Sequence, residues 1–263
     1  MPKASIDAIL ASTRSRVESL HGRRADLERR AQAAAVPPTF GAGIVGTTVG
    51  VVAEVKRRSP SAGVIRSDLD PVAYATAYQA GGAVAVSVLT EEAHFGGSLE
   101  DLERVTRAIS IPALRKDFVV DELQLLEARA AGAALVLLIV RALSDSRLAD
   151  LARAARGLGL ATLVEAHHRS ELDRALAVSP TAVGINNRDL STFVTDLAVS
   201  EALIPQVPRG VITIAESGIE TRSDVERLAA TGADLVLVGE ALARSGRPEE
   251  AVRALSGVAR RSR

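Results

Sequence analysis

Eight short apolar runs, rich in β-branched residues, recur along the chain at intervals of one strand plus one helix. The runs span residues 49–55, 83–89, 112–116, 133–140, 160–166, 181–186, 211–217 and 234–239. Their starts lie 21 to 34 residues apart, with Ala, Leu and Arg at helical spacing between them. Because the runs are apolar without alternation, we expect strands buried on both faces, as in a parallel sheet covered by helices. Eight such units predict an α/β fold of the closed (β/α)8 TIM barrel type, and no GxGxxG dinucleotide fingerprint follows the first run.

The remaining segments predict one domain over residues 1–263, with a barrel core at 49–243 and a C-terminal helix at 244–263. Residues 1–36 are expected to be helical up to the two prolines at 37 and 38, giving an N-terminal helical extension over 1–40. Residues 14–30 of this extension carry six Arg against three acids, which favours the solvated face of an amphipathic helix over an anion-binding helix. The stretch RRSPSAG at 57–63 is expected to be a loop, either a mobile flap or a plain surface loop.

Charge and cysteine content exclude several classes of function. The 32 basic residues balance the 32 acidic ones, which argues against a generic binder of nucleic acid or anionic membranes. The chain has no Cys, which removes disulfides, thiolate metal ligands and Cys nucleophiles. No secretory segment or membrane span is recognisable, so we expect a cytoplasmic protein. No His, Asp and Glu spacing resembles a metal site and no GxSxG elbow is present, so neither a metal nor a serine triad is predicted.

Lysine is used sparingly. Only Lys3, Lys56 and Lys116 occur, against 29 Arg, and the last two fall at the ends of the first and third predicted strands. A lysine ammonium can release its proton when its surroundings shift its pKa, whereas an arginine guanidinium stays protonated. The placement therefore indicates proton transfer.

In a parallel barrel the residues that end each strand meet at the carboxyl-terminal mouth, where such barrels carry their chemistry. These residues are Glu54, Lys56, Ser87, Thr90, Lys116, Asp117, Glu165, Asn186, Arg188, Glu216, Ser217, Gly218, Gly239 and Glu240. Lysines and carboxylates this close to an apolar wall must pair or shift their pKa values. Salt bridges that join strand ends would account for any single pair, but not for the position of all of them at one end. His167 and His168 follow Glu165, and we assign them no role.

Small residues after the seventh and eighth strands predict a phosphate site. Ser217 and Gly218 follow strand seven, and Gly239 follows strand eight just before a short helical segment. Loops at these two positions, with a helix N-terminus, form the usual phosphate cradle of TIM barrels. Tight turns would explain the glycines equally well if they were considered one at a time.

Several motifs together resemble indole-3-glycerol phosphate synthase, an enzyme family of tryptophan biosynthesis. They are AEVKRRSPSAG (53–63), SVLTEEAHFGGSLEDL (87–102), LRKDFVVDELQLLEARAAGA (114–133), LVEAH (163–167), GINNRDLSTF (184–193), AESGI (215–219) and LVGEAL (237–242). The resemblance covers every barrel unit in order, over about residues 49–243. It implies a phosphate-binding (β/α)8 barrel whose N-terminal extension, residues 1–40, lies across the mouth.

The resemblance also implies a reaction and residue roles. The substrate would be 1-(2-carboxyphenylamino)-1-deoxyribulose 5-phosphate, converted by ring closure, decarboxylation and dehydration to indole-3-glycerol phosphate, CO2 and water. Lys116 matches the general acid, with a pKa that burial or a neighbouring ammonium would lower, and Glu165 matches the base or second acid of the dehydration. Lys56 matches the residue that holds the substrate carboxylate and takes part in proton transfer. The residues that orient the lysines and hydroxyls are Glu54, Asn186 and Glu216.

The rest of the binding site follows from the same resemblance. Phe95 and Phe118 match an aromatic wall for the anthranilate ring, with Leu137 and Leu190 as apolar neighbours; Phe118 would also suit the core. The phosphate positions are matched by Ser59, Ser217, Gly218, Gly239 and the backbone NH of Glu240, and Ser87 and Arg188 complete the predicted substrate contacts. No cofactor is expected, because formation of the aromatic indole drives the decarboxylation. Ala62, Ala93-His94 and Ala241 depart from residues common in the family, leaving His94 or nothing as the second ring contact.

Other interpretations stay open from the sequence. They are a phosphoribosylanthranilate isomerase-like barrel, a Schiff-base aldolase at Lys116, and a catalytically silent paralogue that binds phosphate. The pairing of Lys56 with Lys116 argues against the isomerase, and the presence of both lysines with Glu165 argues against a silent paralogue. We expect a small sugar-phosphate substrate, no nucleic-acid or membrane partner, and a monomer or weak homodimer.

Overall fold

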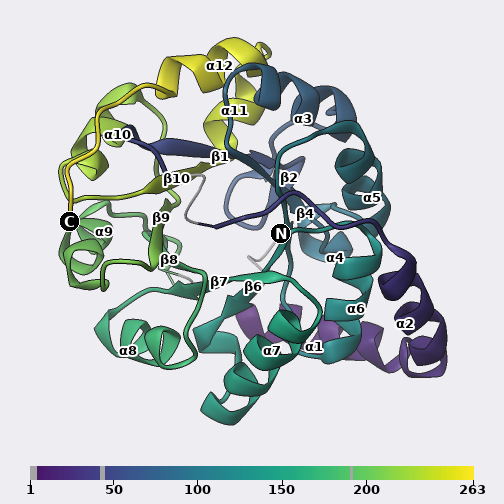
Figure 1. Ribbon diagram of the computed structural model, residues 1–263. Coiled ribbons are helices and arrows are strands. Elements are labelled where there is room, and N and C mark those ends of the chain that lie inside the picture. The colour runs from purple at the N-terminus through teal and green to yellow at the C-terminus, as the bar shows by residue number, and fades with distance from the viewer. Residues whose placement is uncertain (1–4, 42–44, 190–191) are drawn as a thin grey trace.

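The computed structural model describes residues 5–41, 45–189 and 192–263 and shows a closed barrel of parallel strands inside a ring of helices (Figure 1). The barrel strands are β1 (Gly50–Val55), β4 (Ala85–Leu89), β5 (Ala113–Lys116), β6 (Leu135–Ile139), β7 (Ala161–Ala166), β8 (Ala182–Asn186), β9 (Ile212–Glu216) and β10 (Leu235–Val238). Strand β1 pairs with β4 on one side and with β10 on the other, which closes the sheet. Each strand lies within one of the eight apolar runs, so the predicted TIM barrel is confirmed.

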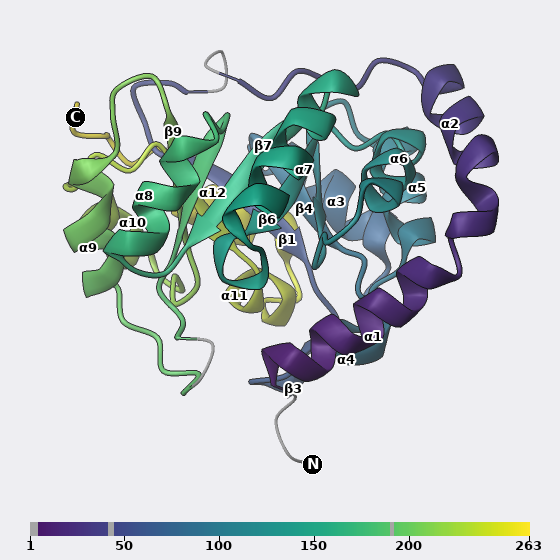
Figure 2. The same ribbon diagram turned by 90° about the horizontal axis from the view of Figure 1, so that it is seen from below.

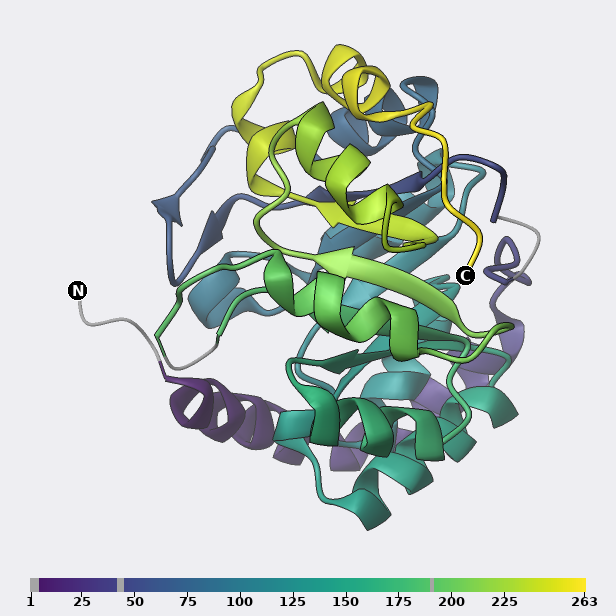
Figure 3. The same cartoon turned by 90° about the vertical axis from the view of Figure 1, so that its left-hand side faces the viewer.

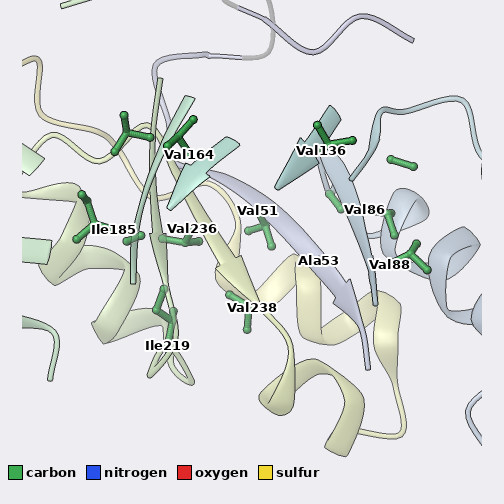
Figure 4. Packing of buried hydrophobic residues seen from close by; sticks show 14 of the residues in the cluster. Val51, Ala53, Val86, Val88, Val136, Val164, Ile185, Ile219, Val236 and Val238 are labelled. Carbon is green, nitrogen blue, oxygen red and sulfur yellow. The ribbon is translucent and has the colours of Figure 1, made fainter. Parts of the chain in front are cut away.

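Both faces of the strands are buried, as the unbroken apolar runs predict. In β1, Val51 and Ala53 join the cluster between barrel and helices, whereas Val52 joins the cluster that fills the barrel interior. Figure 4 shows the outer cluster, with Val86, Val88 and other strand residues directed toward the surrounding helices. The alternation follows from the period of two in a strand, which sends successive side chains to opposite faces.

Helices form the connections between successive strands. They are α3 (Pro71–Ala80), α4 (Glu92–Phe95), α5 (Leu99–Ala108), α6 (Glu122–Ala130), α7 (Asp145–Gly157), α8 (Arg169–Ala177), α9 (Ala198–Leu203), α10 (Arg222–Ala229), α11 (Glu240–Arg244) and α12 (Pro248–Leu255), with single turns η3 (Val140–Ala142) and η4 (Ile204–Gln206). Local sequence sets several of their starts: Asp121 with Gln124 and Thr221 with Asp224 form capping boxes for α6 and α10. None of the described helices combines the length and the apolar character needed to span a bilayer.

The N-terminal extension is helical but broken, which corrects the expectation of one helix over residues 1–36. It comprises α1 (Ile6–Glu18), the single turn η1 (His21–Arg23) and α2 (Arg24–Ala33). Figure 2 shows α1 at one end of the barrel, and α2 packs against α6. Leu20, Leu27 and Ala31 pack against Leu123 and Leu126 of α6. The break lets the two helices cover different surfaces, the barrel end and the barrel side.

Two further segments differ from the sequence prediction. Residues 57–63, expected as a loop, contribute to a small antiparallel hairpin formed by β2 (Arg58–Ser59) and β3 (Gly63–Val64). The helix expected over 244–263 is confined to α12, and residues 256–263 are not helical. This last segment instead places Arg260 and Arg263 against the buried Asp234, at the end of the barrel opposite α1 (Figure 3).

Candidate active site

The carboxyl ends of the strands surround a cavity whose floor is an ammonium group between two carboxylates. Lys116 at the end of β5 has its Nζ 3.3 Å from Oε2 of Glu165 on β7 and forms an ion pair with Glu216 on β9. All three side chains are at most 13 % exposed. Sheet register produces this arrangement, because Glu165 is level with Gly184 and Glu216 is level with Asn186. A side chain at Gly184 would collide with the carboxylate of Glu216, so a larger residue there would displace that carboxylate from Lys116.

These charges shift one another's pKa values. Burial acts most strongly on Lys116 and lowers its pKa, but Glu216, Glu165 and Glu54 together outweigh burial, so the pKa is raised. This corrects the expectation of a lowered value. Burial raises the pKa of Glu216 to about 7, and Glu165 and Glu54 add to this effect while Lys116 opposes it. Burial also disfavours the charge of Glu165, but Lys116, His167 and Asn186 reverse this and lower its pKa.

The second lysine, Lys56, belongs to another group of charged side chains at the mouth of the cavity. The Nζ of Lys56 lies 3.2 Å from Oε1 of Glu54 and 3.9 Å from Oε1 of Glu240. Arg188 approaches the same oxygen of Glu240 with Nη2 at 3.3 Å and donates another hydrogen bond to the hydroxyl of Ser61. Arg188 therefore joins the hairpin after β1 to the start of α11, across the mouth of the cavity.

One wall of the cavity is apolar and aromatic. The ring centres of Phe95 and Phe118 lie 6.2 Å apart with the ring planes at 42°. Leu137 of β6 lines the cavity beside them, and Ile6 and Ile9 of α1 contribute apolar surface to the same space. The arrangement suits a flat aromatic group held near the lysines.

The opposite wall consists of small residues in the loops after β9 and β10. Ser217 and Gly218 both have positive φ, 67° and 75°. A Cβ at Gly218 would collide with Thr195, and one at Gly239 would come within 2.5 Å of Oε1 of Glu54. The two glycines therefore keep backbone groups accessible where side chains would fill the space. Gly239 is the N-cap of α11, and Ser59 of the hairpin lines the same cavity.

The structure brings nearly all the predicted site residues to one cavity. The cavity is lined by Glu54, Lys56, Ser59, Phe95, Lys116, Phe118, Leu137, Glu165, Asn186, Arg188, Glu216, Ser217, Gly218, Gly239 and Glu240. Ser87 lies behind its wall, fully buried, with Oγ 3.5 Å from Oε2 of Glu54. Leu190 lies outside the described residues. His94 does not line the cavity, because its Nδ1 lies 2.9 Å from Oε1 of Glu91, the residue that caps α4.

Sequence reasoning overlooked two groups of residues near the cavity. Arg115 points away from the barrel interior and is fully buried, with Nη2 2.8 Å from Asp117 and 3.1 Å from Glu127. Arg16 of α1 reaches the same Glu127 at 2.8 Å, which ties the N-terminal helix to the strand that carries Lys116. The alternation of side chains along β5 could have revealed that Arg115 faces outward. The second group is His167, for which no role could be assigned from the sequence; its Nε2 lies 3.5 Å from Oε1 of Glu165.

The fold and the cavity together define a class: a (β/α)8 barrel with a lysine–carboxylate cluster and glycine-containing loops after its last two strands. Among the residues that the structure describes, no group of three or more His, Cys, Asp and Glu could hold a metal ion.

The sequence model of the indole-3-glycerol phosphate synthase family matches residues 6–255, and the chain belongs to this family. The curated relatives that match include two proteins named indole-3-glycerol phosphate synthase that illustrate the similarity. The one from Mycobacterium avium (strain 104) is 46 % identical over 253 residues, covering 95 % of this chain and 93 % of its own. The one from Micrococcus luteus is 51 % identical over 204 residues, covering 78 % and 76 %. A solved structure described as "Native KDPGal structure" is similar in fold, with a TM-score of 0.58 at 17 % identity, covering 80 % of this chain and 94 % of that one.

Proposed function

We propose that this protein is an indole-3-glycerol phosphate synthase that converts 1-(2-carboxyphenylamino)-1-deoxyribulose 5-phosphate to indole-3-glycerol phosphate, CO2 and water. The observation that carries the proposal is the ammonium of Lys116 held between Glu165 and Glu216 beside an aromatic wall. The substrate has a matching polarity, with an aromatic acid at one end and a phosphate at the other. Membership of the family supports the same assignment.

Ring closure requires a proton donor at the ketone. The ring carbon that bears the carboxylate attacks the ketone carbon, and the carbonyl electron pair becomes an alkoxide that takes a proton from Lys116. An alkoxide is a stronger base than an amine, so this transfer is favourable although the pKa of Lys116 is raised. Loss of CO2 from the same ring carbon leaves its bonding electrons in the ring and restores aromaticity. The step explains why a charged lysine suits the centre of the cavity.

Dehydration requires an acid and a base on the ring-closed intermediate. The hydroxyl takes a proton from the ammonium of Lys56 and leaves as water, and a proton is lost from the neighbouring carbon that becomes part of the indole. Glu165 serves this step, because its lowered pKa keeps it ionised and able to accept a proton. Lys56 lies on the other side of the cavity, where it would hold the substrate carboxylate and exchange protons with Glu54 and the substrate. Glu54, Asn186 and Glu216 orient these groups.

The aromatic wall and the glycine-containing wall of the cavity would bind the two ends of the substrate. The anthranilate ring would lie against Phe95 and Phe118, beside Leu137. The phosphate would be held by the hydroxyl of Ser59 and by the backbone at Ser217, Gly218, Gly239 and Glu240, with Arg188 beside the sugar hydroxyls. Ser87 would contribute only through Glu54, given its burial.

Activity measurements test the proposal. Purified protein, without added metal, should form a product with indole fluorescence from the carboxyphenylamino deoxyribulose phosphate. Lys116→Arg should remove this activity while leaving the circular dichroism spectrum unchanged, because a guanidinium cannot release its proton. Absence of product from folded wild-type protein would contradict the synthase assignment and favour a silent phosphate-binding paralogue. Partial activity in Lys116→Arg would assign the acid role to another group, and borohydride trapping of an adduct would indicate a Schiff base.

A cytoplasmic location and a monomeric or weakly dimeric state remain predictions. The large apolar side chains exposed in the described part of the chain are Val36, Val64 and Val194, which lie on separate segments. Single exposed apolar side chains are normal on a protein surface and need no partner chain to explain them. Sedimentation velocity at micromolar concentration should show a species near the mass of one chain, 27.5 kDa.

A further inference from the structure

His167 occupies a fixed position immediately behind the candidate active site. It follows β7, two positions after Glu165, and its side chain is 7 % exposed. One carboxylate oxygen of Glu171, in the first turn of α8, binds both the main-chain NH of His167 at 2.8 Å and the ring Nδ1 at 3.0 Å. Two bonds to one oxygen hold both the backbone and the ring, so the direction of the imidazole is set by α8.

The other ring nitrogen is directed at Glu165. Nε2 of His167 lies 3.5 Å from Oε1 of Glu165, is buried, and has no hydrogen-bond partner within the described residues. The second oxygen of Glu165, Oε2, lies 3.3 Å from Nζ of Lys116. Glu165 thus has Lys116 on the side of the cavity and His167 on the side of the helices. A shift of a few tenths of an ångström would complete the bond from Nε2, because ordinary hydrogen bonds to oxygen are about 3 Å long.

The charges around the ring favour imidazolium. Burial opposes the charged ring, but Glu171, Glu165 and Glu216 outweigh it and raise the pKa of His167. In turn, the charge on His167 is one of the influences that lower the pKa of Glu165, second to Lys116 among the neighbouring charges. The adjacent His168 also reaches Glu171, with Nε2 3.2 Å from Oε1, but its side chain is 59 % exposed. His167 and His168 therefore share one carboxylate, and only His167 also approaches Glu165.

We infer that His167 is a positioning residue for the reaction: held by Glu171, its charged ring fixes Glu165 from behind and keeps that carboxylate ionised while Lys116 releases its proton. The inference rests on the proposed function and deepens it. When Lys116 gives its proton to the substrate, Glu165 loses its neighbouring positive charge. A second cation behind Glu165 keeps it a carboxylate at that moment, so that it is ready to accept the proton of the dehydration step.

Two variants separate the two bonds of the ring. The amide of Asn overlays Nδ1 of histidine, so His167→Asn retains the bond to Glu171 and removes the group that faces Glu165. The amide of Gln reaches the position of Nε2, so His167→Gln can supply a neutral donor to Glu165. His168→Gln is the matched control, because it alters the exposed neighbour that contacts the same Glu171.

The primary measurement is the pH profile of kcat/KM. In His167→Asn the acid limb should move to higher pH by about one unit, because Glu165 loses an adjacent positive charge. His167→Gln should show a smaller shift in the same direction, and His168→Gln none. A uniform loss of kcat/KM at every pH in both His167 variants, with unmoved limbs, would indicate a purely structural histidine and overturn the inference.

A second measurement does not depend on activity. The chain has four histidines, so nuclear magnetic resonance of the imidazole nitrogens, assigned with the two variants, can follow His167 directly. In the wild-type protein His167 should remain charged at pH values above the ordinary histidine pKa of about 6.5. Glu171→Gln should lower the pKa of His167, because the ring loses a neighbouring negative charge. A neutral His167 at pH 6 in the wild-type protein would overturn the inference. If the wild-type protein had no synthase activity, the proposed function would fail. The titration alone would then decide whether a charged His167 lies between Glu171 and Glu165.

Discussion

At the residue scale, Glu216 has the least favourable surroundings of the site's carboxyl groups. Its side chain is 1 % exposed, its Oε1 has no hydrogen-bond partner within the described residues, and Glu165 and Glu54 are nearby. Lys116 compensates on one side only. Burial without full pairing favours the neutral acid, which is why the pKa of Glu216 is raised to about 7.

This raised pKa makes stability depend on pH in a defined direction. Between the ordinary pKa of 4.5 and about 7, the folded protein keeps the proton of Glu216 while the unfolded chain releases it. The free energy of unfolding therefore falls as pH rises through this window, by about 3 kcal/mol from this group. Glu216→Gln mimics the neutral acid and should remove that part of the slope.

Urea unfolding at several pH values between 5 and 8 measures the effect. The stability of Glu216→Gln relative to the wild-type protein should increase across the range, because other titrating groups are common to both. A difference that stays constant from pH 5 to pH 8 would mean that Glu216 titrates as an ordinary carboxyl.

Much of the site could be predicted at this scale, for a physical reason. Glu54, Lys116, Glu165 and Glu216 each end an apolar run, and parallel strands in one barrel bring such ends together. The orientation of His167 could not be predicted, because it depends on the path of the loop after β7 and on a contact with the next helix. The direction in which the pKa of Lys116 is shifted could not be predicted either, since it depends on how many carboxylates lie within a few ångströms.

At the element scale, α1 is held to the barrel by its own buried face and by an ion-pair network that begins at the partly exposed Arg16. Arg16 of α1 contacts both carboxylate oxygens of Glu127 at 2.8 Å, and Arg115 joins Glu127 to Asp117, next to Lys116. The same helix presents Ile6 and Ile9 to the cavity. The ion pair at Arg16 therefore positions apolar surface over the substrate site.

We expect Arg16→Met to weaken substrate binding more than turnover. The variant keeps the apolar stem but releases α1, so KM should rise about five-fold with a smaller change in kcat, as a partly exposed pair contributes on the order of 1 kcal/mol. Arg30→Met is the matched control, because Arg30 joins α2 to Glu103 at 2.6 Å on the side of the barrel. Equal KM values in the two variants would show that α1 does not shape the site.

The elements themselves differ in how far sequence could predict them. The strands are identifiable because burial on both faces leaves continuous apolar runs, as in β6. The break after α1 is harder to identify. Gly22 weakens the helix there, but one glycine inside a helical pattern does not by itself end a helix, and the packing of Leu20 and Leu27 against α6 depends on the tertiary structure. The hairpin at Arg58–Ser59 and Gly63–Val64 is too short for a periodic pattern to reveal.

At the scale of the whole molecule, the two ends of the barrel have separate tasks. The cavity lies at the carboxyl ends of the strands, whereas Asp234 lies just before β10 at the amino ends. Asp234 is 3 % exposed and accepts hydrogen bonds from the NH and hydroxyl of Thr213 and from Arg260 and Arg263. This arrangement follows the general division of such barrels into an active face and a stability face.

We therefore expect changes at Asp234 to alter stability without altering catalysis. Arg263→Met should lower the free energy of unfolding by about 2 kcal/mol, less than the roughly 3–5 kcal/mol lost when a buried charge loses its only partner, because Arg260 remains. The kcat and KM of the folded variant should equal those of the wild-type protein, since α1 and the strand mouths are untouched. Adding Asp234→Asn to Arg263→Met should cost less than the sum of the single changes, because the two side chains form one ion pair. Urea denaturation and steady-state kinetics test this on the wild-type protein, Arg263→Met, Asp234→Asn and the double variant. A raised KM in Arg263→Met would show that the two ends of the barrel are coupled.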